Sequence, residues 1–255
     1  MVLSIEFAGS TGTGKTTLVR ETRAVMESRG MPVFSPFELV FGRRARRLVP
    51  DERIQNVMLD VALFPLAIAF CARHPAVAWL LFSRLLLRPP PAVRAAARMR
   101  SLVAKMGVSM LGGVCRGRPG VVLIDEGMLH SVHHVFVYTA TTASAETLEA
   151  FARAVPLADL VVNLSASERA IVEATLRRSD PPIRAAGVEA IAESARRALE
   201  LFDVLGRHPR ISSRSIPIRL GPDTMSLTAA ATIITERAAV MLPEHAVLPT
   251  ATVVR

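Results

Sequence analysis

The chain opens with VLSIEFAGSTGTGKTTLVRETRAVMESRG, residues 2–30, and this stretch decides the fold. Residues 2–8 are a short apolar run that predicts a buried strand. After a turn rich in glycine and threonine, residues 15–29 carry apolar side chains at helical spacing, and Gly30 stands where a helix should stop. A second short strand is predicted at 31–35. Strand, turn, helix and strand in this order predict the start of a parallel α/β sheet.

The turn matches the pattern G-x-x-x-x-G-K-[ST] at every defined position, residues 9–16. Glycines allow backbone angles that turn N–H groups inward, and the following helix N-terminus favours negative charge. Lys15 would place a compact charge on terminal phosphates, and the Thr16 hydroxyl would ligate Mg²⁺. The alternative is a chance glycine-rich turn. We predict a loop that binds a nucleoside triphosphate, formed by Gly9, Ser10, Thr11, Gly12, Thr13, Gly14, Lys15, Thr16 and Thr17.

Two acidic residues end a later apolar run. Residues 121–124 predict a buried strand, and Asp125 and Glu126 follow it directly. Because ligands bind at the carboxyl ends of parallel strands, we expect Asp125 to hold Mg²⁺, through water. The alternative for Asp125 is a carboxylate in a strand-end turn. Glu126 could orient an attacking water, act on a substrate hydroxyl, or be a solvated neighbour.

The rest of the pattern predicts one domain, residues 1–255. Further strands are expected at 160–164 and 215–220, and helices at about 127–138, 166–178, 187–206 and 225–241. Residues 43–118 are mostly helical in pattern and predict an insertion, and the chain from 243 onward predicts a loose tail. The expected fold is a three-layer α/β fold with a mainly parallel sheet, this helical insertion and a short lid at about 177–186.

Composition limits the class of protein. With 255 residues and 51% hydrophobic residues, the chain can bury a sizeable core, which excludes global disorder. The net charge of +9 is typical of nucleic-acid binders, but a single Tyr and a single Trp leave few platforms for stacking bases, so nucleic acid is not the expected partner. Two cysteines are too few for a disulfide scaffold, and no secretion signal is recognised, so we expect a cytoplasmic protein.

The insertion contains three apolar stretches, at 57–70, 76–87 and 102–114. Arginines and prolines interrupt or flank them, and none reaches the roughly 18 uninterrupted apolar residues of a membrane span. Our first interpretation is a set of buried helices on the substrate side. The second is a pair of helices that makes peripheral contact with a membrane, because apolar density with flanking arginines is also typical of interfacial helices.

In the order of its elements, most of 1–240 resembles the thymidylate kinase-like branch of the P-loop nucleoside and nucleotide kinases. The loop at 9–16, the acidic strand end at 121–127, the segment VVNLSASERAIVEATLRRSDPPIR and the closing strand SIPIRL carry the resemblance. It implies lid arginines, which Arg169, Arg177 and Arg178 match. Arg177 would bind the nucleotide, and Arg178 would stabilise the charge of the transferred group; the alternative is that both are solvated.

The chain departs from the family pattern in two places. Where the family commonly has Asp-Arg, this chain has Asp125 and Glu126, so an arginine near the acceptor is missing. Where the family commonly has Glu-Pro after the second strand, the nearest carboxylate is Glu38. It is a candidate base for the acceptor hydroxyl; the alternative is a carboxylate at a helix start, shortly after Ser35 and Pro36.

Two more groups could contribute to a site. The densest basic cluster, Arg43, Arg44, Arg46 and Arg47, falls where an anionic group of the acceptor would dock in a family-like layout, or else is a solvated helix face. His130 shares a helix face with His133 or His134. A metal bound there lacks a third ligand in the sequence, so we favour a helix that lines the acceptor pocket.

The expected enzyme is a P-loop small-molecule kinase. It would use ATP and Mg²⁺ to phosphorylate a small acceptor, and the resemblance favours a nucleotide or nucleoside; a sugar, a lipid-linked molecule or another small alcohol stays open. The alternative is a nucleotide-hydrolysing ATPase that acts as a switch or regulator on a protein or membrane partner, which the Asp125-Glu126 pair favours. Formation of a homodimer is left open.

Overall fold

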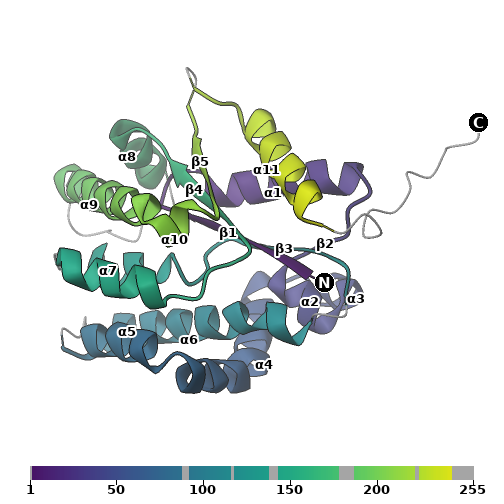
Figure 1. Cartoon of the computed structure of the whole chain (residues 1–255), viewed down its shortest axis with the longest axis horizontal. Helices are drawn as coiled ribbons and strands as arrows, with labels where there is room; N and C mark the ends of the chain where they lie inside the picture. The colour runs from purple at the N-terminus through teal and green to yellow at the C-terminus, as the bar shows by residue number, and fades with distance from the viewer. Residues whose placement is uncertain are drawn as a thin grey trace, which may run out of the picture.

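Figure 1 shows a computed structural model of the chain, which describes residues 2–87, 92–115, 118–137, 143–177, 187–221 and 224–242. Five strands form one sheet in the order β2-β3-β1-β4-β5, and every neighbouring pair is parallel. The expectation of a parallel α/β sheet is therefore confirmed. The strands are β1 (Val2–Gly9), β2 (Val33–Phe34), β3 (Gly120–Ile124), β4 (Leu160–Ser165) and β5 (Ser215–Arg219).

Helices cover both faces of the sheet, which gives the predicted three layers (Figure 1). On one face, α1 (Lys15–Ser28) packs beside α11 (Leu227–Met241), and their apolar sides form a core with Leu3, Ile5 and Phe7 of β1. On the other face lies a larger core, to which α7 (Ala145–Ala154), α9 (Gly187–Arg207) and the insertion contribute. Alternate residues of β1 point to opposite cores because side chains alternate along a strand.

The insertion is helical, as expected. It contains α3 (Arg43–Leu48), α4 (Glu52–Arg73), α5 (Pro75–Leu87) and α6 (Ala92–Val114), and α2 (Pro36–Phe41) precedes it. Helices α4 and α6 pack very closely: a Cβ added at Gly107 would lie 2.6 Å from Leu63 Cβ. One described helix, α4, is long and apolar enough to cross a membrane by length and composition alone.

Some helices differ from the expectation. The helix predicted at 127–138 is wrong in its first half: turns follow β3, and a short π-helix, η1 (His133–Val137), comes later. Neither α2 nor α7 was predicted as a separate helix, although Ser35 and Ser144 cap their N-termini. The helices predicted at 166–178, 187–206 and 225–241 are confirmed as α8 (Glu168–Leu176), α9 and α11. Most of the predicted lid, including Arg178, and the predicted tail lie outside the described residues.

Candidate active site

The turn between β1 and α1 has the backbone of a phosphate-binding loop. Gly12 and Gly14 have φ angles of 90° and 88°, which L side chains rarely adopt. A Cβ at Gly12 would also lie 2.9 Å from the carbonyl oxygen of Ile171 in α8. Gly14 then serves as the N-cap of α1, with no side-chain cap, so the first N–H groups of the helix stay directed toward the loop. This arrangement favours an anion at the helix N-terminus.

Lys15 folds back across the loop that precedes it. Its Nζ donates to the carbonyl oxygens of Gly9, at 3.0 Å, and Ser10, at 2.8 Å. The Thr13 hydroxyl donates to the same Ser10 oxygen at 2.8 Å, which tightens the loop. The side chain of Lys15 is buried, so its ammonium is held in the loop rather than exposed to solvent. The fixed positive charge and the loop amides together can bind a polyphosphate.

Thr16 and Asp125 meet at the carboxyl edge of the sheet. Strands β1 and β3 are neighbours with Glu6 beside Ile124, so the residue after β3 lies at the same edge of the sheet as the loop that leads into α1. The Thr16 hydroxyl donates to Asp125 Oδ2 at 2.7 Å. Asp125 Oδ1 is buried and has no hydrogen-bond partner among the described residues. Burial raises the pKa of Asp125 above its usual value, although the bond from Thr16 acts against that shift.

These oxygens fit a magnesium ion. Mg²⁺ prefers oxygen ligands and commonly binds through one or two carboxylates and substrate phosphates. A buried carboxylate oxygen without a hydrogen-bond donor is costly unless it binds something, and a cation would satisfy it. Thr16 and Asp125 thus lie together at this edge of the sheet, and their role as metal ligands stays a prediction. Thr17 follows on α1 and is exposed.

Glu126 is surrounded by groups that donate to it or can carry positive charge. Lys105 Nζ lies 3.2 Å from Glu126 Oε2, His130 Nε2 lies 3.3 Å from Oε1, and His134 Nε2 lies 3.8 Å from Oε2. Burial alone would raise the pKa of Glu126, but the electrostatic influence of His130, the nearby His134 ring and the charge of Lys105 hold it well below the usual range. Glu126 is therefore ionised at neutral pH and can accept a hydrogen bond from a ligand.

The histidine segment forms a polar wall beside the loop. Thr11 Oγ1 lies 3.3 Å from His133 Nε2, so the wall touches the phosphate-binding loop directly. The His130 and His133 rings stack with centroids 5.1 Å apart, beside Phe202. Burial lowers the pKa of His133 to about 3 and that of His130 well below its usual value, so both rings are neutral at pH 7. We call Glu126, His130, His133 and His134 the histidine wall.

The structure places a third possible metal ligand, Glu126, beside His130 and His134. Ligand atoms of Glu126, His130 and His134 lie within 4.8 Å of one another. Lys105, however, places a buried ammonium 3.2 Å from a Glu126 oxygen, and an ammonium there would compete with a cation for that carboxylate. The contacts are those of an ion-pair network, and the expectation that this segment lines a pocket stays a prediction.

Glu6 was missed by the sequence analysis. It lies within β1, is 2% exposed and accepts the backbone N–H of His130 at 3.1 Å. Burial raises its pKa to about 7, although backbone hydrogen bonds from His130, Leu129 and Gly127 act against that shift. A Cβ at Gly127 would lie 2.6 Å from Glu6 Oε2. Glu6 thus anchors the turn that positions Glu126 and the histidines. The only signal was a lone acid in an otherwise apolar strand.

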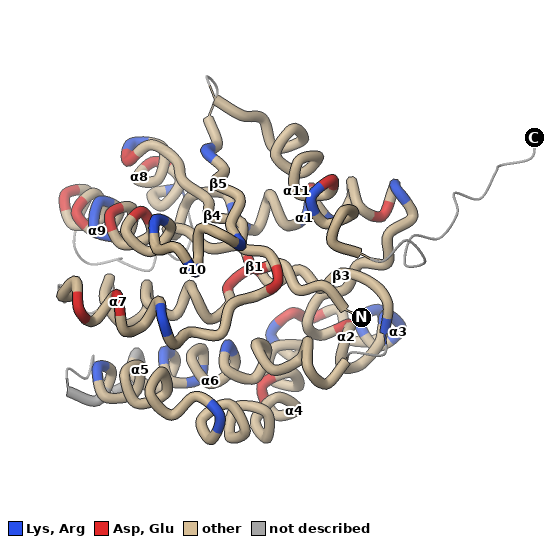
Figure 2. The backbone as a smooth tube through the Cα atoms, in the orientation of Figure 1, with Lys and Arg blue, Asp and Glu red and all other residues tan. Residues whose placement is uncertain are grey.

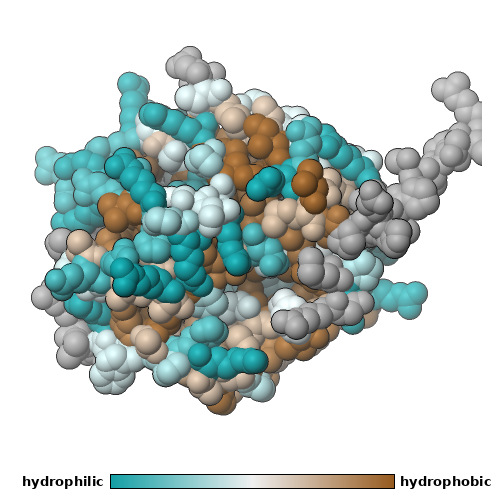
Figure 3. Space-filling view, viewed as in Figure 1, coloured by the Kyte–Doolittle hydropathy of each residue, from teal (hydrophilic) through white to brown (hydrophobic). Residues whose placement is uncertain are grey.

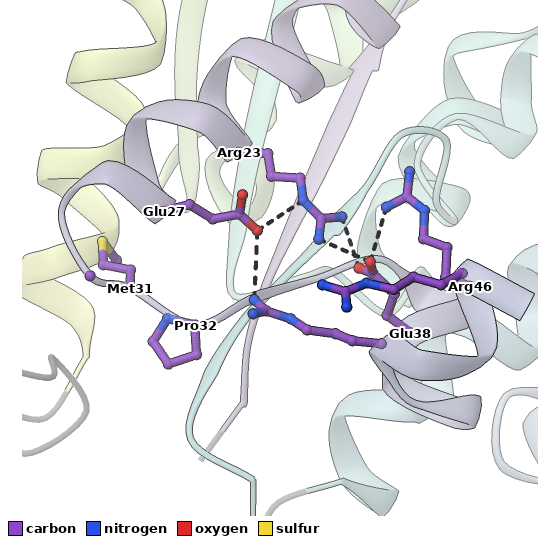
Figure 4. A pocket seen from close by; sticks show the side chains of 9 residues that line it. Arg23, Glu27, Met31, Pro32, Glu38 and Arg46 are labelled. Atoms are coloured by element: carbon purple, nitrogen blue, oxygen red, sulfur yellow. Dashed lines mark hydrogen bonds and ion pairs between the residues drawn. The ribbon is translucent and has the colours of Figure 1, made fainter.

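Glu38 is held by arginines at the start of α2 (Figure 4). Arg23 binds both carboxylate oxygens, at 2.8 and 3.0 Å, and Arg46 adds a contact at 3.0 Å. The Ser35 N–H donates to the same carboxylate and the Ser35 hydroxyl accepts from the Glu38 N–H, which forms a capping box. Burial would raise the pKa of Glu38, but these donors lower it to about 2. Its contacts match the helix-start alternative, and its role as a base stays a prediction.

An open pocket of about 760 Å³ adjoins Glu38 (Figure 4). Arg43, Arg46 and Arg47 of the predicted basic cluster line it, whereas Arg44 is exposed on α3 outside the lining. Arg43 and Arg46 already contact Glu27 and Glu38. Arg23, which also lines the pocket, lies eight residues beyond Lys15, about 12 Å along α1. The pocket is thus about two helical turns from the phosphate-binding loop.

Helix α8 carries the described lid arginines. Its residues Ile171 and Thr175 lie against Gly12, so the helix packs on the phosphate-binding loop. Arg177 directly follows α8, and its side chain is 81% exposed with a contact of 3.8 Å to Glu173. Arg169 pairs with the same Glu173 at 2.9 Å and is also exposed. The structure therefore places Arg177 at the end of a helix that touches the loop, with its side chain in solvent.

Fold and loop together define the class: the protein has a P-loop α/β fold. No family model matches the chain, and no curated protein matches it. Among solved structures it is similar to a deoxyadenosine kinase from M. mycoides, with 12% identity, a TM-score of 0.48, and coverage of 93% of this chain and 100% of that one. It is also similar to a shikimate kinase from Acinetobacter baumannii, with 14% identity, a TM-score of 0.42, and coverage of 94% and 95%. The class rests on the chain's own fold and loop.

Proposed function

We propose that the protein is a kinase that transfers the terminal phosphoryl group of ATP to a small acceptor, with Mg²⁺ as cofactor. One observation carries this proposal: the Thr16 hydroxyl and the Asp125 carboxylate meet at 2.7 Å beside a loop with two left-handed glycines and a buried lysine. These groups are the ones needed to bind a polyphosphate and its metal. The phosphate-binding loop at 9–17 would bind the β- and γ-phosphates.

Transfer would depend mainly on positioning and charge. The Lys15 ammonium would exchange its loop carbonyls for phosphate oxygens, and Thr16 and Asp125 would hold the metal. Mg²⁺, when bound, neutralises phosphate charge. Arg177 at the end of α8 would swing toward the nucleotide, and Arg178 would stabilise charge on the transferred group. The exposed position of the Arg177 side chain supports this role, because among the described residues its ion-pair contact is to a surface glutamate, Glu173, at 3.8 Å.

The acceptor hydroxyl needs a group that accepts its proton or orients it. Glu126 follows the metal carboxylate directly, is ionised and is 38% exposed, so it can accept a hydrogen bond from a hydroxyl beside the loop. Glu38 is the second candidate. Its full set of donors and its pKa of about 2 suit a carboxylate that positions Arg23 and Arg46 better than a base.

We propose a nucleotide or nucleoside as the acceptor, following the thymidylate kinase-like resemblance. Arg47 lines the pocket beside Glu38 and makes no ion pair with a described carboxylate. Its guanidinium can therefore bind an anionic group of the acceptor. From the histidine wall the Glu126 carboxylate is accessible to the rest of the acceptor, while the buried His130 and His133 rings lie behind it.

The test is a phosphorylation assay on the purified full chain. Mg-ATP is supplied with a panel of nucleosides, nucleotides and sugars, and both ADP and phosphorylated products are measured by mass spectrometry. We expect at least one acceptor to be phosphorylated and to raise ADP formation. Phosphate release that no acceptor changes, with no phosphorylated product, would overturn the kinase proposal.

A second candidate is an ATPase that acts as a switch or regulator. The observation that favours it is the pair of adjacent carboxylates after β3, in which Glu126 is partly exposed and could orient a water molecule. In this case Glu126→Gln abolishes phosphate release in the absence of any acceptor. The kinase proposal instead predicts slow release without acceptor in both the parent protein and this variant.

A further inference from the structure

One side of α4 is apolar and exposed. Five large side chains, spaced three and four residues apart, are between 51% and 71% exposed: Ile54, Val57, Val61, Phe64 and Ile68. Ala62, Pro65 and Ala72 are exposed as well. Within the most apolar continuous stretch of 18 residues in this helix, only 17% of the residues are buried. We call this set of eight residues the outer face of α4.

The outer face carries no free charge along its length. From Val57 to Ala72, about 24 Å of helix, the only charged residue is Asp60, and it pairs with Arg100 of α6. Figure 2 draws α4 mostly in tan, and brown residues lie in its region at the lower edge of Figure 3. A continuous apolar face of this length on a protein surface typically marks a contact with another protein, a ligand or a membrane.

The opposite side of α4 sets the orientation of that contact. Leu63, Ala67 and Phe70 are buried against the rest of the molecule, and α6 packs along the helix. Crossing a membrane would expose this side and break the core. Helix α4 can therefore lie in the plane of an interface but cannot span it without unfolding the insertion.

The charges at both ends of α4 indicate the chemistry of the partner. Arg53 at the start and Arg73 at the end are exposed, and neither lies within ion-pair distance of a described carboxylate. Asp51 and Glu52, which precede Arg53, are exposed as well, so the positive charge at this end comes from Arg53 together with the arginines of α3. Arg44, on the preceding α3, is also exposed and lies within ion-pair distance of no described carboxylate. Unpaired arginines that bracket an apolar face complement an anionic surface.

An aromatic anchor lies close by in the chain. Trp79, the only tryptophan, is on α5, which begins two residues after α4 ends, and it is 74% exposed. Leu48, just before α4, is 81% exposed. Tryptophan is enriched at the boundary between membrane and water, where its ring is partly apolar and its N–H stays hydrated.

We propose that the outer face of α4 docks onto an anionic membrane surface, with the helix in the plane of the interface and Trp79 at its boundary. A second copy of the chain is the competing occupant, because the spacing of the outer face also suits a helix pair. The observations favour the membrane: each copy has a net charge of +9 and would bring unpaired arginines to a shared interface.

The test uses the full chain and lipid vesicles. Vesicles of phosphatidylcholine alone are compared with vesicles of equal parts phosphatidylcholine and phosphatidylglycerol, by flotation and by the fluorescence of Trp79. We expect flotation with the anionic vesicles at low salt, a shift of Trp79 emission to shorter wavelength, and loss of both at high salt. No flotation with anionic vesicles at low salt would overturn the proposal.

Matched variants locate the contact. Val61→Ser combined with Phe64→Ser should weaken binding to anionic vesicles about tenfold or more, whereas Val240→Ser, at a position 79% exposed on α11, should leave it unchanged. Arg53→Gln and Arg73→Gln should each weaken it about fivefold. Circular dichroism checks that each variant is folded.

Two outcomes would contradict the proposal. If the double variant binds vesicles as tightly as the parent, another surface makes the contact. If light scattering shows a doubled mass that the double variant abolishes, while anionic vesicles bind neither protein, the outer face is an interface between two copies. None of these readouts depends on ATP, so the result is independent of the proposed kinase activity.

Discussion

Lys15 is the single charge on which the proposed chemistry depends most. Its ammonium is buried in the loop and contacts two carbonyl oxygens that a polyphosphate would replace. Lys15→Ala removes this charge, and removal of one preorganised electrostatic group typically lowers turnover by about 10²–10³. We expect that loss in ADP formation with the best acceptor. Arg29→Ala, at an exposed position just after the same helix, serves as the control and should be fully active; an active Lys15→Ala enzyme would contradict the assignment.

The ion pairs of Glu38 should make the free energy of unfolding depend on pH. Its folded pKa of about 2 lies below the ordinary value of 4.5, so its ion pairs stabilise the fold above pH 4.5 and this contribution is lost as the pH falls toward 2. The size of the contribution is about 3 kcal/mol. Glu38→Gln should therefore lower the free energy of unfolding in urea by about this amount at pH 7, with a smaller difference at pH 3.

The same variant separates the two roles of Glu38. If Glu38 only positions Arg23 and Arg46, binding of the acceptor weakens while turnover at saturating acceptor is kept. If it is the base, Mg-ATP binding stays intact and turnover falls by about 10²–10⁴. Equal unfolding free energies for variant and parent at pH 7 would contradict the structural role.

At the scale of elements, the sequence predicts those segments whose structure depends on neighbouring residues. It does not predict segments whose structure depends on contacts with residues far away in the chain. The loop at 9–16 was predicted because its pattern and its flanking strand and helix are local. The turn after β3 was not, because Glu6, over a hundred residues earlier, binds its backbone and replaces a helix that the local pattern favoured. The start of α2 was offered only as the alternative for Glu38, and its extent was not predicted because the helix is only six residues long.

The packing of α4 on α6 gives a test at this scale. A Cβ at Gly107 would lie 2.6 Å from Leu63 Cβ and 2.8 Å from its carbonyl oxygen, so Gly107→Ala forces the two helices apart. We expect it to lower the free energy of unfolding by about 1–3 kcal/mol. Gly112→Ala, on the same helix with nothing within 4 Å, should stabilise the protein by up to about 1 kcal/mol. Thermal unfolding checks both, and a Gly107→Ala protein as stable as the Gly112 variant would show that the contact is loose.

At the scale of the whole molecule, strand order assembles the candidate site. Because β1 lies between β3 and β4, the loop after β1 meets Asp125 from one neighbour and α8 after the other. The sequence predicted the strands and the position of Asp125 at a strand end. It predicted neither the strand order nor the contact of the histidine wall with Thr11, since both depend on pairings between distant residues. For the insertion the sequence favoured buried helices over helices at a membrane surface, because apolar residues predict burial, whereas one side of α4 is exposed in the structure.

Calorimetry with a slowly hydrolysed ATP analogue and Mg²⁺ tests the central claim, that residues 9–16 with Asp125 bind a magnesium nucleoside triphosphate. The parent protein should release heat on binding one analogue per chain, and Asp125→Asn should weaken binding in the presence of Mg²⁺ more than in its absence. If no magnesium nucleoside triphosphate produces heat with the folded parent protein, the loop does not bind a polyphosphate and the proposed function is wrong.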